Sequence, residues 1–196
     1  MTIVPYFKEL LSAIAIALTI FSFYPYIRSV MRGTTTPHVF SWIIWGSTTL
    51  VVFFAQLADG GGIGAWPIGF SGIVTIGVAI LAYTKRSDIS IGTVDWLFFA
   101  AAMSSLPIWY LTADPLWAVV ILTAVDILGF GPTYRKAYGK PYEEHMPFFV
   151  MMAARNIVSA IALEHYSATT LMFPTVIAAA CVAFIAMVVL RRRALA

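Results

Sequence analysis

Long apolar stretches follow one another along almost the whole chain, separated by short polar links. Seven of them are long enough, or nearly so, to cross a hydrocarbon core of about 30 Å, which takes roughly 20 helical residues. We expect seven transmembrane helices near residues 10–30, 38–57, 66–84, 92–111, 116–134, 145–164 and 170–190. The links leave no room for a soluble catalytic or ligand-binding domain. The pattern therefore predicts an all-α integral membrane protein that acts within the bilayer.

Composition agrees with this prediction. Of the 196 residues, 61% are hydrophobic and 11% are charged, and the mean hydropathy is +0.88, far outside the range of soluble domains. Lys8 and Glu9 precede the first apolar stretch, and no small-residue cleavage signal follows it, so we expect a retained helix rather than a signal peptide. Cys181 is the single cysteine, which excludes an intramolecular disulfide.

Positive charge lies on one side of the predicted helices. In this layout ten of the twelve Lys and Arg residues share one side, Lys8 lies on the other, and Arg155 lies within a helix. The positive-inside rule then predicts an outside N-terminus and a cytoplasmic C-terminus. The basic residues indicate topology rather than nucleic-acid binding, and lipid head-group contact by the terminal arginines is the alternative.

An offset of 107 positions relates the first three predicted helices to the last three. Four pairs of uncommon residues align on it without a gap: Pro25 with Pro132, Arg28 with Arg135, His38 with His145, and Pro67 with Pro174. Such matches predict one structural unit used twice. We expect triple-helix units at 1–87 and 114–196, joined by a linker helix within 88–113. Because a single span separates them, the units insert in the same orientation, as a 3+1+3 arrangement of parallel repeats.

This layout, with a proline near the cytoplasmic end of each unit's first helix and a short polar, basic turn after it, resembles the PQ-loop superfamily. That group includes the SWEET sugar carriers, cystinosin-like exporters and KDEL receptors, and nicotinamide riboside carriers share the layout. Tyr26 and Thr133 follow the two prolines where the family signature has glutamine. The resemblance to SWEET carriers implies hinges at four similarly placed prolines: Pro25, Pro37, Pro132 and Pro147. Helix capping is the alternative role for these prolines.

Two ionisable side chains, Asp126 and Arg155, fall deep within predicted helices. Charged groups at membrane depth are costly and commonly mark a pathway, a relay or a counter-ion. Counted from the cytoplasmic ends near Tyr134 and His145, they lie 8 and 10 residues deep, roughly 12 to 15 Å at about 1.5 Å per residue. Their matching depth on consecutive antiparallel helices lets them pair.

Arg155 belongs to a stripe with i, i+3, i+4, i+7 spacing: Met152, Arg155, Asn156 and Ser159. The offset maps this stripe onto Trp45, Thr48, Thr49 and Val52, and maps Asp126 onto Thr19. We expect the stripes to face each other across one central cavity. The predicted substrate-binding residues are Trp42, Trp45, Thr48, Asp126, Arg155 and Asn156.

In that cavity we expect Arg155 and Asn156 to hold an anionic or amide-bearing solute and the tryptophans to supply stacking surface. Asp126 is expected to neutralise Arg155 or to take up a proton. The alternative is an ion pair that only fixes the fifth helix against the sixth, although burying such a pair rarely gains stability over apolar packing. For Trp45 the alternative is packing against lipid.

Other site chemistries lack their usual spacing. His38 and His145, the latter beside Glu143 and Glu144, show no HxxxH or HExxH motif, so we expect solvated helix ends and no metal. No nucleophile and base pair and no phosphate-binding loop appear, so we expect neither an enzyme nor a cofactor. A retinal protein needs a lysine in its last helix, and no lysine follows Lys140.

Two further carboxylates, Glu164 and Asp95, are expected to have structural roles. His165 and Glu164 are predicted to form a solvated loop pair at the outer side. Asp95 is predicted to be a near-interface carboxylate held by Lys85 or Arg86.

The sequence thus predicts a carrier that moves a small polar solute by alternating access, with proton coupling through Asp126 left open. The solute classes are sugars, amino acids, and vitamin- or nucleoside-like compounds. A membrane receptor or sensor that binds a ligand without net transport is the alternative. The expected partners are the solute and the lipid bilayer, without nucleic acid, and a homo-oligomer stays open. Short loops suit a plasma membrane, with a bacterial inner membrane the expected one.

Overall fold

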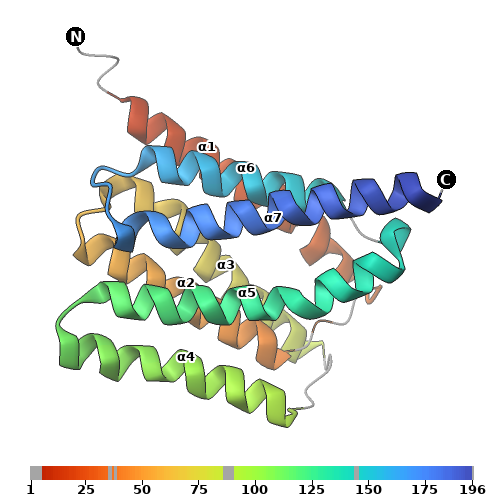
Figure 1. Ribbon diagram of the computed structural model, residues 1–196, viewed down its shortest axis with the longest axis horizontal. Coiled ribbons are helices and arrows are strands. Elements are labelled where there is room, and N and C mark those ends of the chain that lie inside the picture. The colour runs from red at the N-terminus through yellow and green to blue at the C-terminus, as the bar shows by residue number, and fades with distance from the viewer. Residues whose placement is uncertain (1–5, 35–36, 38, 86–90, 144–145, 196) are drawn as a thin grey trace.

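The chain folds into helices, with no strand in the part that the structure describes. The computed structural model describes residues 6–34, 37, 39–85, 91–143 and 146–195, with the side chains among them except those at positions 95, 131–133, 135, 136 and 143. The helices are α1 (Phe7–Met31), α2 (Val39–Ala58), η1 (Gly62–Ala65), α3 (Trp66–Thr84), α4 (Thr93–Thr112), α5 (Pro115–Gly139), η2 (Pro141–Glu143), α6 (Met146–Ala162) and α7 (Ala168–Leu195). Figure 1 shows the α-helices lying side by side, with the two chain termini at opposite ends. The expected all-α fold is confirmed.

Four helical segments are long and apolar enough to cross a membrane: Phe7–Met31, Val39–Ala58, Gly62–Thr84 and Ala168–Leu195. These lengths and compositions are those of a multi-pass membrane protein. In the other three α-helices the apolar segments among the described residues are shorter, at Trp96–Thr112, Pro115–Phe130 and Met146–Ala162; those in α4 and α5 are bounded by residues 95 and 131, whose side chains lie outside the described part. For α6 the difference from the predicted stretch has a local cause, because the helix ends at Ala162 and the chain turns before α7 begins.

The helices form two groups of three. In one group α3 packs against both α1 and α2, and in the other α7 packs against both α5 and α6. The groups meet where α1 packs on α6 and where α2 packs on α5. Helix α4 packs on α5 and α2 at the edge of the molecule (Figure 1). The centre of the protein therefore lies between the two groups.

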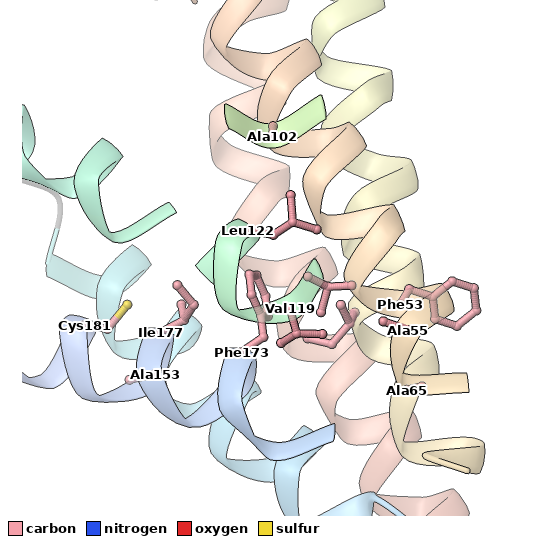
Figure 2. Packing of buried hydrophobic residues seen from close by; sticks show 12 residues of the cluster. Phe53, Ala55, Ala65, Ala102, Val119, Leu122, Ala153, Phe173, Ile177 and Cys181 are labelled. Atoms are coloured by element: carbon pink, nitrogen blue, oxygen red, sulfur yellow. The ribbon is translucent and has the colours of Figure 1, made fainter. Parts of the chain in front are cut away.

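An apolar cluster holds the groups together at this centre. Figure 2 shows Phe173 of α7 beside Val119 of α5, with Ile177 and Cys181 farther along α7 and with residues of α2, α4 and α6 in the same cluster. In lipid, apolar side chains gain little from leaving the acyl chains, so close van der Waals packing drives helix association. The cluster fixes the spacing between α5 and α7, and thereby the position of Asp126 on α5.

Glycines bring α2 and α3 into close contact. A Cβ at Gly46 would lie 2.5 Å from Ile76 Cδ1, and one at Gly69 would lie 2.8 Å from the ring of Phe53. Real Cβ atoms do not approach that closely, so a larger residue at either position would require the side chain of Ile76 or of Phe53 to move. Small residues at helix contacts are typical of membrane bundles.

Candidate functional site

A cavity of about 780 Å³ lies between the two groups of helices. Among the described residues, its lining comes from α1, α2, α3, α5, α6 and α7, with Pro37 just before α2, and none comes from α4. The polar lining side chains are Ser22, Tyr26, Ser29, Ser41, Trp42, Trp45, Thr49, Ser71, Thr75, Asp126 and Arg155. Solute sites in helix bundles are concave and mostly apolar, with a few converging polar groups, and this cavity has that character.

Asp126 projects from α5 and is partly exposed. The hydroxyl of Thr48, a residue that is 1% exposed, donates to the carbonyl of Trp45 at 3.0 Å and shares this proton over a longer distance of 3.4 Å with Oδ1 of Asp126. Among the described residues no donor contacts the other carboxylate oxygen. One oxygen of Asp126 is therefore oriented by α2, and the second remains available to a ligand.

Arg155 projects from α6 and is 2% exposed. Its Nη2 donates to Asn156 Oδ1 at 3.2 Å, and the amide of Asn156 in turn donates to the carbonyl of Met152 at 2.8 Å. Nε and Nη1 of Arg155 are buried and have no hydrogen-bond partner among the described residues. Buried charged groups are normally paired, so this guanidinium lacks a partner that an anion would supply.

The two charged side chains line one cavity without touching each other. Both residues belong to the described part of the chain, and no salt bridge joins Asp126 to Arg155. The structure does not contain the direct pair that their matching depth allows. Each charge instead has its own polar neighbour: the carboxylate lies 3.4 Å from the hydroxyl of Thr48, and the guanidinium donates to Asn156.

Aromatic rings form one wall of the cavity. The ring centroid of Trp42 lies 4.9 Å from that of Tyr26, 5.8 Å from that of Trp45 and 6.2 Å from that of Phe23. Trp45 is 38% exposed and lies against α5 at Gly129, where a Cβ would be 3.3 Å from the indole Nε1. The missing side chain at position 129 gives the indole its place. This wall offers a stacking surface for a planar group.

The predicted binding residues fall into two sets. Trp42, Trp45, Asp126 and Arg155 line the cavity. Thr48 and Asn156 do not line it, and they lie behind it, each in contact with one of the two charged groups. Their geometry is that of positioning residues. Tyr26, Ser71 and Thr75 also line the cavity and were not predicted.

The four predicted hinge prolines lie in different surroundings. Pro25 is inside α1 and lines the cavity, and Pro37 lines it just before α2 begins. Pro147 is exposed in the first turn of α6 and does not line the cavity. Pro132 lies within the bounds of α5, and its side chain is outside the described part of the structure. The hinge role stays a prediction for all four.

One end of the bundle is closed by two loops, residues 59–65 and 163–167, which we call the closed end. The backbone N–H of Glu164 donates to the carbonyl of Gly61 at 3.1 Å, and the carboxylate of Glu164 accepts from the N–H of Ile63 at 3.0 Å. Helix α6 adds a hydrogen bond of 3.0 Å from Ser159 to the carbonyl of Gly64. A Cβ at Gly64 would lie 2.3 Å from the backbone nitrogen of Leu163, so the loops touch backbone to backbone.

The histidine of the closed end has a different partner from the predicted one. Nδ1 of His165 lies 2.9 Å from the carbonyl oxygen of Asp59 and 3.7 Å from its carboxylate. Glu164 is bound to Ile63 instead. The predicted His165–Glu164 pair is therefore replaced by contacts that join α6–α7 to α2–α3. His38, Glu144 and His145 lie outside the described residues, as does the side chain of Asp95.

The cavity extends toward the opposite end, which we call the basic end because Arg28, Arg32, Lys85 and the arginines at 191–193 lie there. Its lining includes Ser29, in the last turn of α1, and Pro37. No residue of the closed end lines the cavity among those described. The cavity therefore reaches from mid-bundle to the basic end.

Comparisons of the chain with protein-family models, curated proteins and solved structures find no match. The resemblance to the PQ-loop superfamily accordingly stays a prediction. Among the described residues no group of three or more His, Cys, Asp and Glu side chains gathers closely enough to hold a metal ion.

Proposed function

We propose that this protein is a membrane carrier that moves a small polar solute by alternating access. The observation that carries the proposal is the central cavity, in which, among the described residues, the buried guanidinium of Arg155 has two nitrogens without hydrogen-bond partners and one oxygen of Asp126 has no donor. Ionisable residues inside a membrane bundle that face a cavity commonly mark a solute or ion pathway. A purely structural role for Arg155 would leave two of its three buried guanidinium nitrogens without a hydrogen bond among the described residues.

In this proposal all seven α-helices span the membrane. Helix α6, with 17 residues, is roughly 25 Å long at about 1.5 Å per residue and is at the lower end of the spanning range. Helices α4 and α5, with 20 and 25 residues, are longer. The positive-inside rule assigns the basic end to the cytoplasm and the closed end to the outside. We assign the protein to a plasma membrane, and expect a bacterial inner membrane because the loops are short.

Packing supports the doubled unit in a 3+1+3 arrangement. Exchanging α1, α2 and α3 for α5, α6 and α7 converts each packing pair into another observed pair: α1–α3 into α5–α7, α2–α3 into α6–α7, and α1–α6 into α5–α2. The start of α6 agrees with the offset, since 39 + 107 = 146 relates the first residue of α2 to the first residue of α6. Helix α4 has no counterpart in this exchange, as a linker between parallel units requires.

Side chains at equivalent positions also make equivalent hydrogen bonds. Thr49 Oγ1 donates to the carbonyl of Trp45 at 2.7 Å, and Asn156 Nδ2 donates to the carbonyl of Met152 at 2.8 Å. Both residue pairs are related by the offset, since 156 − 49 = 107 and 152 − 45 = 107. The two stripes that flank the cavity thus share a local geometry, which supports a two-fold relation between the units.

Alternating access requires that each end of the cavity closes in turn. The structure has one end closed and the cavity extended toward the other, which corresponds to an inward-facing state in the proposed topology. Rocking of helices α1–α3 against α5–α7 would part the loops of the closed end and bring the rings of Tyr26 and Phe148 together over the basic end. Proton coupling through Asp126 fits this scheme, because its carboxylate is not engaged in a salt bridge with Arg155.

The test is uptake of labelled sugars, amino acids, nucleosides and vitamins into proteoliposomes, with and without a pH gradient. We expect time-dependent accumulation of one class, abolished by Arg155→Gln and retained by Arg193→Gln, which removes the same charge from an exposed position. Dependence of the rate on the pH gradient, lost in Asp126→Asn, would support proton coupling. Saturable binding without accumulation would contradict a carrier and would favour a receptor.

A further inference from the structure

Asp126 and Arg155 are the only Asp, Glu, Lys or Arg residues among the described lining of the cavity. They carry opposite charges and are not joined by a salt bridge. A solute with a single charge would satisfy one group and place a like charge, or no charge, beside the other. Burying a charge without a partner is strongly unfavourable. The lining therefore favours a solute that carries both charges.

The two groups present complementary free atoms. Among the described residues, Nε and Nη1 of Arg155 are buried donors without hydrogen-bond partners, whereas Nη2 donates to Asn156. Because solvent does not reach these two nitrogens, a carboxylate in the cavity would engage them once the guanidinium turns toward it. A carboxylate accepts charge-assisted hydrogen bonds from such donors. On Asp126, Oδ1 has only the long contact of 3.4 Å with the hydroxyl of Thr48, and the other oxygen has no donor among the described residues, so the carboxylate can accept from an ammonium group.

Besides the two charges, the aromatic wall of the cavity indicates the kind of side chain that the solute carries. Trp42 lies with its ring near those of Tyr26 and Trp45, and Gly129 leaves the face of α5 bare where the indole of Trp45 lies. Aromatic pairs in offset or edge arrangements contribute about 0.5–1.5 kcal/mol beyond the area they bury. A planar apolar side chain placed against this wall would add aromatic contacts of the same kind.

We propose that the solute is a zwitterionic aromatic amino acid, bound with its carboxylate on Arg155, its ammonium group on Asp126 and its ring against Trp42 and Trp45. That this solute is transported rests on the proposed carrier function. That it binds in this geometry does not depend on transport. This inference narrows the predicted solute classes to one and assigns each charge of the solute to a named residue.

The test is isothermal titration of the purified full chain in detergent with four probes. L-Tryptophan carries the ring and both charges, indole-3-propionate lacks the ammonium group, tryptamine lacks the carboxylate, and L-alanine lacks the ring. We expect tryptophan to bind about tenfold or more tightly than each of the others, since one well-made charged contact is a factor of this order. Equal affinities, tighter binding of a singly charged probe, or no binding of tryptophan would overturn the proposal.

Two variants test the assignment of charges. In Arg155→Gln we expect tryptamine to bind more tightly than tryptophan, and in Asp126→Asn we expect indole-3-propionate to do so. A merely structural role would weaken all probes in parallel and would contradict the assignment. If either variant fails to fold, the affinities of the four probes for the unchanged protein still test whether the solute carries both charges and the ring.

The outcomes also separate this inference from the carrier proposal. Tryptophan that binds but does not accumulate in proteoliposomes would contradict transport and leave the site intact. Accumulation of another solute class, with no binding of tryptophan, would overturn this inference and leave the carrier function standing.

Discussion

At the closed end, loops 59–65 and 163–167 touch backbone to backbone and are joined by hydrogen bonds from one loop to the other. At the basic end, the cavity reaches Ser29 and Pro37 between helices whose facing side chains are largely aromatic. The closure consists of polar contacts that each contribute about 0.5–1.5 kcal/mol. A set of small, separable contacts can be exchanged for others at modest energetic cost, as a reversible gate requires.

Forcing the two loops of the closed end apart should have the largest effect on the difference between the closed end and the basic end. Gly64→Ala places a Cβ 2.3 Å from the backbone nitrogen of Leu163, which cannot move away as a flexible side chain would. We expect the two loops of the closed end to separate. The reporter is a cysteine introduced at the cavity residue Ser71 in a Cys181→Ala background. It should react about tenfold faster with an impermeant maleimide applied outside intact cells.

The matched control is Gly77→Ala on the same helix group, because no atom of the described residues lies within 4 Å of a Cβ at that position. It should leave the labelling rate unchanged. Equal labelling in the Gly64 and Gly77 variants would show that the loop contact does not close the cavity.

Neutralising the carboxylate of Asp126 should produce the next largest effect, and this effect should be on solute uptake rather than on stability. Asp126→Asn keeps the size of the side chain and its contact with Thr48, so we expect the melting temperature to change little. Solute uptake should fall about tenfold, since one charged contact to the solute is lost. Uptake rates at matched protein content measure this effect, and unchanged uptake would exclude a role for Asp126 in the solute pathway.

A smaller effect is expected from filling the space beside the indole. In Gly129→Ala the new Cβ would lie 3.3 Å from Nε1 of Trp45, so the ring must shift by a few tenths of an ångström. We expect solute affinity to weaken by about threefold, measured by titration. Gly139→Ala on the same helix, where the space is open, is the control, and a similar loss in both variants would argue against a stacking role for Trp45.

Losing one hydrogen bond of the closed end should have the smallest effect. Ser159→Ala removes the bond of 3.0 Å to the carbonyl of Gly64, which contributes about 1 kcal/mol. We expect a melting temperature in detergent a few degrees lower and a modest rise in outside labelling of the Ser71→Cys reporter. A higher melting temperature would mean that this bond does not stabilise the closed end.

The charged part of the site could be predicted because its signal is local. An Asp or Arg inside an apolar stretch is visible without knowledge of its neighbours, and both Asp126 and Arg155 line the cavity. Ser71 and Thr75 gave no such signal, because hydroxyl side chains in membrane helices commonly bond their own backbone, as Thr75 does to the carbonyl of Ser71. Whether they face a cavity depends on how α3 is rotated against its neighbours.

The helices themselves followed from hydropathy, and the closed end did not. Apolar length predicts a helix directly, and α2 begins and ends within one residue of the predicted stretch at 38–57. The contact of Gly61 with Glu164 joins residues about a hundred positions apart, and depends on a glycine leaving room for another backbone. Nothing in the local pattern encodes which two loops meet.

Counterflow tests the central claim most directly, because it requires one site that opens to each side in turn. Proteoliposomes are preloaded with the unlabelled solute that binds most tightly, and the labelled solute is then added outside. The account predicts a transient accumulation of label above its equilibrium level, absent in Arg155→Gln and present in Arg193→Gln. Label that only rises to equilibrium, or that binds without entering, would contradict alternating access through the cavity between the two helix groups.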